Sequence, residues 1–125
     1  MDTTAQVDLF FARKPRQWAL FEALRTTLCE AHPQTQLRVM KTCIALVDPK
    51  PYCYVSSPRP AMANGKPDEA LLLTISLRQR MDHPRFAMVV PISARRFTVH
   101  MVISREEEID GELLALIGLS RECPK

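Results

Sequence analysis

Apolar residues that alternate with polar ones mark most of the strands expected in this chain. The longest unbroken run is 37–47, LRVMKTCIALV, in which β-branched Thr42 and Ile44 favour an extended backbone. A two-residue period places Lys41 on the same face as Leu37 and the other odd-numbered apolar residues of the run. The pattern therefore predicts one central strand over 37–47, with a lysine that points the same way as apolar side chains.

Three later segments also have the pattern of strands. Residues 52–56 and 97–103 alternate, whereas 70–77 is almost wholly apolar, as expected for a strand covered on both faces in the middle of a sheet. Two prolines in 48–51 end the first strand. Because this connection is so short, it predicts an antiparallel hairpin between 37–47 and 52–56.

Helical periodicity occurs near both ends of the chain. From Arg16 to Ala31 the apolar positions form one stripe, and Pro15 is suited to the first turn. The sequence SREE at 104–107 has the capping-box pattern and predicts the start of a last helix. The expected buried stripe of that helix comprises Ile109, Leu113, Leu116 and Ile117.

The segment 82–91 permits two interpretations. Asp82 and Pro84 resemble an N-cap and a first helical turn, which predicts a short helix that Pro91 ends. A buried strand over 86–90 is the alternative, because these residues are apolar as well.

The order of these elements predicts an α+β fold. Runs of strands between terminal helices favour an antiparallel sheet of four strands, or slightly more, with the N- and C-terminal helices on one face. A length of 125 residues is that of one domain, so we expect a single domain over 1–125. Residues 1–13 form an N-terminal arm whose apolar end, LFF, is expected to dock on the domain, and 57–69 is a proline-rich loop.

The charge of the chain is small but unevenly distributed. The 17 basic and 14 acidic residues leave a net charge of +3, which is too small to demand nucleic acid and is compatible with an anionic ligand. Between residues 78 and 105 a single acid, Asp82, accompanies six arginines, whereas 106–112 holds five acids. The six are Arg78, Arg80, Arg85, Arg95, Arg96 and Arg105. This bias predicts a basic surface.

Several classes of protein and site lack their signatures here. The N-terminus has no basic region followed by a long apolar run, and 70–77 is too short to span a bilayer as a helix. We therefore expect a cytoplasmic protein without a membrane partner. Four scattered cysteines without CxxC spacing predict reduced thiols and no metal site. With only three glycines there is no glycine-rich phosphate loop, and no cofactor is predicted.

Several phrases of the sequence resemble a known family. FFARKPRQWALFEALR, QLRVMKTCIALVDP, LLLTISL, PRFAMVV, RRFTVHMVIS and EEIDGELLALI follow one another from about Asp8 to Ile117. Their order and spacing are similar to those of a small uncharacterised bacterial domain, the YdhG-like group, at the C-terminus of proteins labelled predicted transport proteins. The resemblance implies an α+β fold and no established activity.

The most specific parts of this resemblance are Lys41-Thr42, the sequence PRF at 84–86, and RFT at 96–98 with His100. Two features depart from the pattern of the family. Cys43 stands where the resemblance implies an aromatic residue, and the proline-rich loop is longer than usual. A site beside either feature is therefore expected to differ in this chain.

Two residues are candidates for chemistry because of their places on strands. Lys41 could bind an anion or form a Schiff base, because burial favours its neutral amine; alternatively, its stem lies over apolar surface while the ammonium group reaches solvent. His100 shares a face with Thr98 and Val102, and could transfer protons or bind a metal. The other histidines offer no zinc-ligand spacing, so an ordinary surface histidine is the alternative.

Arg85, Arg95 and Arg96 form the third candidate. Guanidinium groups suit bidentate binding of phosphate or carboxylate, although a solvated basic face weakly paired with the acids of 106–112 is the alternative. Tyr52 and Tyr54 lie near arginines in the sequence and could stack on bases, although two aromatic residues are weak support for nucleic acid as a partner.

We predict a non-catalytic binding or interaction module with a basic surface for an anionic small molecule or protein partner. The predicted ligand-binding residues are Lys41, Arg85, Arg96, His100 and Tyr54. One alternative is a small enzyme that uses Lys41 or His100 as nucleophile or base. Another is a scaffold that forms a homodimer through its sheet edge or the helix that bears Trp18.

Overall fold

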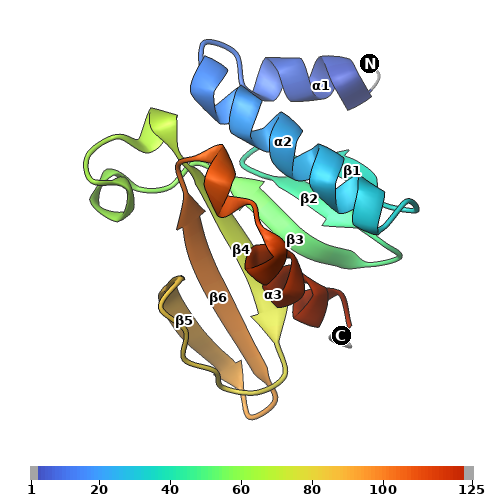
Figure 1. Ribbon diagram of the computed structural model, residues 1–125, viewed down its shortest axis with the longest axis vertical. Helices are drawn as coiled ribbons and strands as arrows, with labels where there is room; N and C mark the ends of the chain where they lie inside the picture. The colour runs from blue at the N-terminus through green and yellow to red at the C-terminus, as the bar shows by residue number, and fades with distance from the viewer. Residues whose placement is uncertain (1–2, 123–125) are drawn as a thin grey trace.

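An antiparallel sheet of six strands is the centre of the α+β fold, which confirms the predicted fold class with more strands than four (Figure 1). The computed structural model describes residues 3–122. The strands are β1 (Gln36–Val39), β2 (Ile44–Val47), β3 (Pro51–Ser56), β4 (Leu71–Leu77), β5 (Phe86–Ser93) and β6 (Arg96–Ile103). Their order is β1-β2-β3-β4-β6-β5, so β1 and β5 form the edges.

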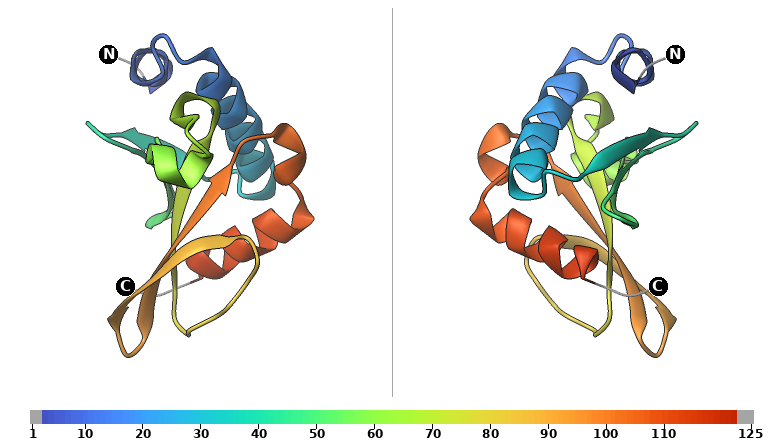
Figure 2. Two further views of the ribbon diagram at one scale, coloured as in Figure 1. Left: turned by 90° about the vertical axis from the view of Figure 1, so that its left-hand side faces the viewer. Right: turned by 90° about the vertical axis from the view of Figure 1, so that its right-hand side faces the viewer.

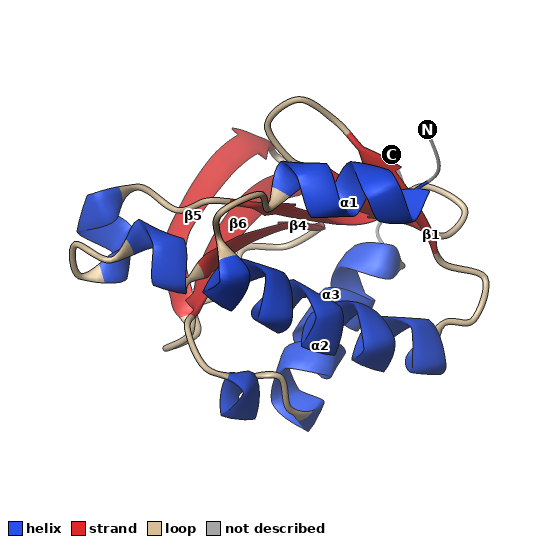
Figure 3. Cartoon of the chain, turned by 90° about the horizontal axis from the view of Figure 1, so that it is seen from above, coloured by secondary structure: helices blue, strands red, loops and turns tan. Residues whose placement is uncertain are grey.

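Helices α2 (Pro15–Ala31) and α3 (Gly111–Arg121) cover one face of the sheet (Figures 1 and 2). The first helix, α1 (Thr3–Phe10), contacts β1, and in the view from above it lies over the end of the sheet (Figure 3). The described part of the chain also contains three 3₁₀ turns: η1 (Pro60–Ala63), η2 (Pro67–Glu69) and η3 (Glu106–Glu108). None of the three α-helices covers the opposite side of the sheet, which we call the open face (Figure 2).

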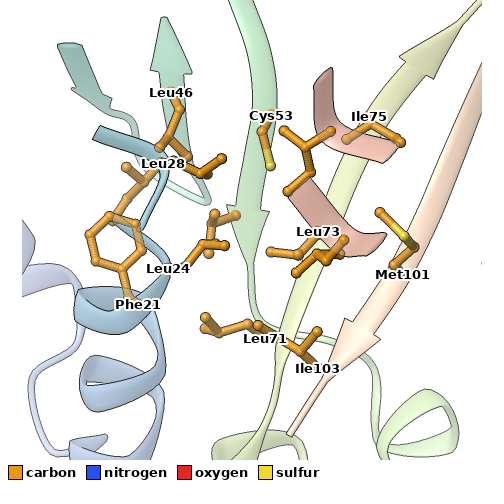
Figure 4. Close-up of a cluster of buried hydrophobic side chains, with 14 of the residues drawn as sticks. Phe21, Leu24, Leu28, Leu46, Cys53, Leu71, Leu73, Ile75, Met101 and Ile103 are labelled. Carbon is orange, nitrogen blue, oxygen red and sulfur yellow. The ribbon is translucent and has the colours of Figure 1, made fainter. Parts of the chain in front are cut away.

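The hydrophobic core fills the space between the helices and the sheet (Figure 4). Phe21, Leu24 and Leu28 form the buried stripe of α2 that the sequence predicts, and Pro15 stands at the start of this helix. On β4 only alternate residues are buried, because helices cover one face alone. The prediction that 70–77 is covered on both faces is therefore wrong.

The single strand predicted over 37–47 is also wrong, because the segment is a hairpin. Leu37 and Val39 of β1 lie opposite Leu46 and Ile44 of β2 in an antiparallel pair. All four side chains therefore face the helices. In one continuous strand the odd-numbered Leu37 and Val39 would point to one face of the sheet, and the even-numbered Ile44 and Leu46 to the other. Because the chain reverses between β1 and β2, all four side chains reach the core.

The helix predicted over 82–91 is wrong, and the alternative of a strand is correct in type. β5 is not a buried strand, because it lies at the edge of the sheet and most of its residues are exposed or half-buried. Pro91 lies within the strand, opposite Phe97 of β6. An edge strand tolerates proline, because one side of its backbone has no ladder to complete.

The last helix begins later than the capping box predicts. The box forms one residue later than predicted, with Arg105 as N-cap and Glu108 in place of Glu107, and it belongs to the 3₁₀ turn η3. Glu108 accepts hydrogen bonds from the backbone N–H groups of Ser104 and Arg105. The N-cap of α3 is Asp110, whose carboxylate accepts a hydrogen bond from Leu113 N at 3.0 Å. Ile109 consequently precedes the helix whose stripe it was expected to join.

The segments predicted as arm and loop both contain helical turns. Residues 3–10 of the arm form α1, and Val7 and Phe11 are buried in the core, whereas Leu9 is 66% exposed. The 57–69 connection contains η1 and η2. Across residues 3–122, no helix has the length and apolar character needed to cross a membrane.

Candidate functional site

The open face of the sheet collects three of the five residues that the sequence predicts as ligand-binding. Strand register places Tyr54 of β3, Thr74 of β4 and His100 of β6 directly opposite one another, which puts their side chains on one face. Arg96 lies four residues before His100 on the same strand, on the same face and about 13 Å away. Tyr54, Arg96 and His100 are all half-buried.

His100 is held in place from the neighbouring strand. Its Nδ1 lies 2.9 Å from the Thr74 hydroxyl, within hydrogen-bond distance. Burial, and then the positive charge of Arg59, lower the pKa of His100 below its ordinary value of 6.5. The imidazole is therefore neutral at pH 7. Because the pKa is lowered, the face is less positive at neutral pH than the number of its basic residues implies.

Lys41 is not part of this face. It lies in the turn between β1 and β2, where Met40 N donates a hydrogen bond to Cys43 O at 2.8 Å. Its side chain is exposed, at the margin of a groove that Lys14 and Leu9 also line. The sequence suggested a lysine among apolar side chains, but the turn removes those neighbours. Lys41 thus lacks the burial that would favour a neutral, nucleophilic amine.

Arg85 is engaged in contacts within the chain, away from Lys41 and the open face. Its guanidinium group lies 2.7 Å from Asp110 Oδ1 and 3.3 Å from Glu112 Oε1, and it also donates to the carbonyl oxygen of Glu108. Burial by itself would lower the pKa of Arg85, but the two carboxylates raise it above its ordinary value. These contacts join the start of β5 to the start of α3.

The ion pair of Asp110 predicts a dependence of stability on pH. The Leu113 backbone N–H and then the Arg85 guanidinium hold the pKa of Asp110 below its ordinary value of 3.8. A lowered pKa in the folded state stabilises the fold above pH 3.8, and this contribution is lost as the pH falls through the folded-state value. We expect Asp110→Asn, which keeps a cap, to be less stable than the natural protein at pH 7, with a smaller deficit at about pH 2.5.

Urea unfolding at the two pH values measures this difference. Asp82→Asn removes an exposed carboxylate that has no ion pair within residues 3–122, and it serves as the matched control. A deficit of Asp110→Asn that is equal at both pH values would contradict the assignment.

A second surface is a groove at the end of the sheet where α3 stops. None of the five predicted ligand-binding residues lines it, but Arg95 of the third candidate does. The groove encloses about 1010 Å³. Its floor is Leu77 of β4 and Phe97 of β6, which lie opposite each other. The remaining lining residues are Arg78, Gln79, Arg80, Met81, Ala94, Arg95, Leu119 and Glu122. We call this surface the arginine groove.

Three arginines reach the arginine groove from two separate connections. Arg78 and Arg80 follow β4, and Arg95 lies in the turn between β5 and β6. All three are exposed, and across residues 3–122 none has an ion pair or a side-chain hydrogen bond. Among the described residues of the lining, Glu122 is the one acid. The arrangement can hold an anionic group with bidentate hydrogen bonds above an apolar floor.

The sequence contained a signal for this groove in the arginines between 78 and 105. The sequence did not show which of these arginines lie together in the structure. Arg78, Arg80 and Arg95 surround the groove, Arg96 turns to the open face, and Arg85 is paired with acids. Arg95 and Arg96 are neighbours in the sequence, but only Arg95 lines the groove.

The geometry gives little support to a metal site or a reactive cysteine. Within residues 3–122 no three His, Cys, Asp or Glu side chains gather as metal ligands would. Burial raises the pKa of Cys43 and raises that of Cys53 to about 12, so neither is a reactive thiolate at neutral pH.

No protein-family model, curated protein or solved structure compared with the chain matches it. Membership of the YdhG-like group therefore stays a prediction from the sequence.

Proposed function

We propose that the protein is a non-catalytic binding module whose arginine groove takes an anionic ligand. The observation that carries the proposal is the gathering of Arg78, Arg80 and Arg95 around one groove. Within residues 3–122 none of the three has an ion pair. A phosphate or carboxylate group would pair with them at little cost, because their charges are not engaged in the chain.

The proposed function is the one that the sequence predicts, but its site is a different surface. A basic surface for an anionic small molecule or protein partner remains the function, but none of the five predicted ligand-binding residues lines the groove. A cytoplasmic location and membership of the YdhG-like group belong to the same proposal. The resemblance implies no established activity, and reduced cysteines are typical of the cytoplasm.

The enzyme alternative has less support. Lys41 is exposed, and His100 has a hydroxyl partner but no nucleophile or carboxylate bonded to its other ring nitrogen within residues 3–122.

The scaffold alternative rests on Trp18 and the sheet edge. Trp18 is 40% exposed and donates a hydrogen bond to Asp8 at 3.1 Å, which ties it to α1.

The test is a thermal-shift panel of pyrophosphate, citrate and sugar phosphates on the natural protein and on Arg80→Ala and Arg95→Ala. A ligand present at one hundred times its dissociation constant adds about 2.7 kcal/mol to stability, which raises the melting temperature by several degrees. We expect at least one anion to stabilise the natural protein, and each substitution to reduce that shift.

Lys66→Ala is the matched control, because it removes an exposed positive charge that is not part of the groove. We expect its melting shift to equal that of the natural protein. If the groove variants and Lys66→Ala lost the shift equally, binding would reflect net charge alone. If no anion shifted any of the proteins, the proposed function would be wrong.

A further inference from the structure

The sheet carries no negative charge. Across residues 3–122 none of the six strands contains an aspartate or a glutamate, whereas Arg38, Arg96 and His100 are basic. The open face therefore has cationic side chains at both ends and no acid among its strands. Arg59, from the connection after β3, lies close enough to His100 to lower its pKa. A polyanion that lay along this face would meet no repulsion from the strands.

One row of side chains crosses the whole face. Register places Arg38 of β1 opposite Ala45, Ala45 opposite Tyr54, Tyr54 opposite Thr74, Thr74 opposite His100, and His100 opposite Met88 of β5. Tyr54 and His100 are thus two strands apart, at about 9.6 Å. Thr74 lies between them, and its hydroxyl is within hydrogen-bond distance of His100 Nδ1. Both side chains are half-buried, so each leaves part of its surface exposed.

We propose that the open face binds single-stranded nucleic acid, with bases stacked on Tyr54 and His100 and phosphates near Arg38, Arg59 and Arg96. Flat aromatic rings on an antiparallel sheet, between positive charges, are the general requirement for such binding. The face has hydroxyl groups beside the rings, including that of Thr98, which can bond to base edges. A duplex does not fit, because its bases already stack on one another.

This inference does not rest on the arginine groove. The groove lies on the side of the sheet that carries α3, since its lining includes Leu119 and Glu122. A small anion is also a poor occupant of the open face, because the row crosses several strands and gathers no cluster of guanidinium groups around one hollow. Stacking is the interaction that distinguishes a base from a simple phosphate, and Tyr54 and His100 supply it.

The experiment is a fluorescence-anisotropy titration of labelled oligo(U) and oligo(dT), each of about 12 nucleotides, with a double-stranded RNA of the same length as comparison. We expect both single strands to bind more tightly than the duplex. Tyr54→Leu and His100→Gln are each expected to weaken binding by roughly 5- to 150-fold, the range that corresponds to loss of one stacked base.

Salt dependence separates stacking from charge. Arg96→Ala removes one phosphate contact, so the slope of log affinity against log salt should fall by about 0.7. Tyr54→Leu should weaken binding and leave this slope unchanged. Arg80→Ala removes the same charge from the groove and is the matched control, which we expect to leave both affinity and slope unchanged.

A pair of acidic substitutions keeps the test decisive if Tyr54→Leu fails to fold. Thr98→Glu places a negative charge on the open face, and Thr26→Glu places the same charge on the exposed surface of α2. Only Thr98→Glu should abolish binding. No binding of either single strand, equal binding of the duplex, or equal effects of the two threonine variants would each overturn the inference. Failure here would leave the groove proposal intact, because that proposal is tested with small anions.

Discussion

Replacement of Gln17 by leucine is expected to lower the free energy of unfolding by about 1–3 kcal/mol. Gln17 is fully buried on α2. Its Nε2 donates to the carbonyl oxygens of Pro67 at 2.8 Å and Ala70 at 3.0 Å, and its Oε1 accepts from the Ser57 hydroxyl at 3.3 Å. Leucine has a similar size but no polar atoms. The carbonyl oxygen of Ala70 would lose a buried partner, at about 1–3 kcal/mol if it finds no replacement. Ser57 is exposed, and Pro67 O keeps the hydrogen bond that it accepts from Ala70 N.

Urea unfolding measures the loss, and hydrogen exchange locates it. Because Gln17 holds both ends of the 57–69 connection to α2, amide protection over η1 and η2 should fall more than protection in β4. Gln36→Leu, at an exposed position on β1, is the matched control and should change stability by less than about 0.5 kcal/mol. Equal stability of Gln17→Leu and the natural protein would show that the connection holds its place without this side chain.

Ser120→Ala is expected to lower the free energy of unfolding by about 2–4 kcal/mol. The ladder between β3 and β4 joins only Tyr54–Ser56 to Leu72–Thr74. Continued register would place Tyr52 opposite Ser76, but the Ser120 hydroxyl lies between the strands instead. It donates to Tyr52 O at 2.6 Å and accepts from Ser76 N at 3.0 Å. Alanine would leave both backbone groups unpaired.

The amide proton of Ser76 reports on this contact directly. In Ser120→Ala its exchange should accelerate more than the global loss of stability explains, because its acceptor is gone. Ser93→Ala, at an exposed position on β5 without a side-chain hydrogen bond within residues 3–122, is the control. If the Ser76 amide stayed as protected in Ser120→Ala as in Ser93→Ala, water or a direct bond to β3 would have replaced the hydroxyl.

The hairpin of β1 and β2 shows which feature of the sequence was misread. The run 37–47 contains no glycine, proline, asparagine or aspartate, the residues that usually mark a turn. The evidence for a reversal was a change of parity in the apolar positions, from Leu37 and Val39 to Ile44 and Leu46. Between them stand the polar Lys41 and Thr42, at the turn. The switch of the apolar residues from odd- to even-numbered positions would have located the turn.

The prolines of 82–91 were misleading for a different reason. Pro84 and Pro91 fit the ends of a short helix, and their sequence neighbours do not exclude that interpretation. Only the order of the strands shows that β5 is an edge, where Pro91 breaks no ladder on its free side. That order depends on which strands pair across long separations in the sequence.

The candidate sites also show which features follow from a local pattern and which depend on contacts between distant segments. Alternation correctly placed His100 apart from Phe97, Val99 and Met101, because the period of a strand is local. It could not place Tyr54 level with His100, since their alignment passes through Thr74 of a third strand. Nor could it show that Arg85 is paired with Asp110, which follows 25 residues later.

Periodicity by itself determined the α+β class, the helix over 15–31 and the strands near 52–56, 70–77 and 97–103, because the burial of one face imposes a regular pattern on the residues that form it. The tertiary structure alone decided the strand order, the division of the arginines between groove, open face and ion pairs, and the roles of Gln17 and Ser120. Those depend on contacts between segments far apart in the chain, for which a local pattern carries no information.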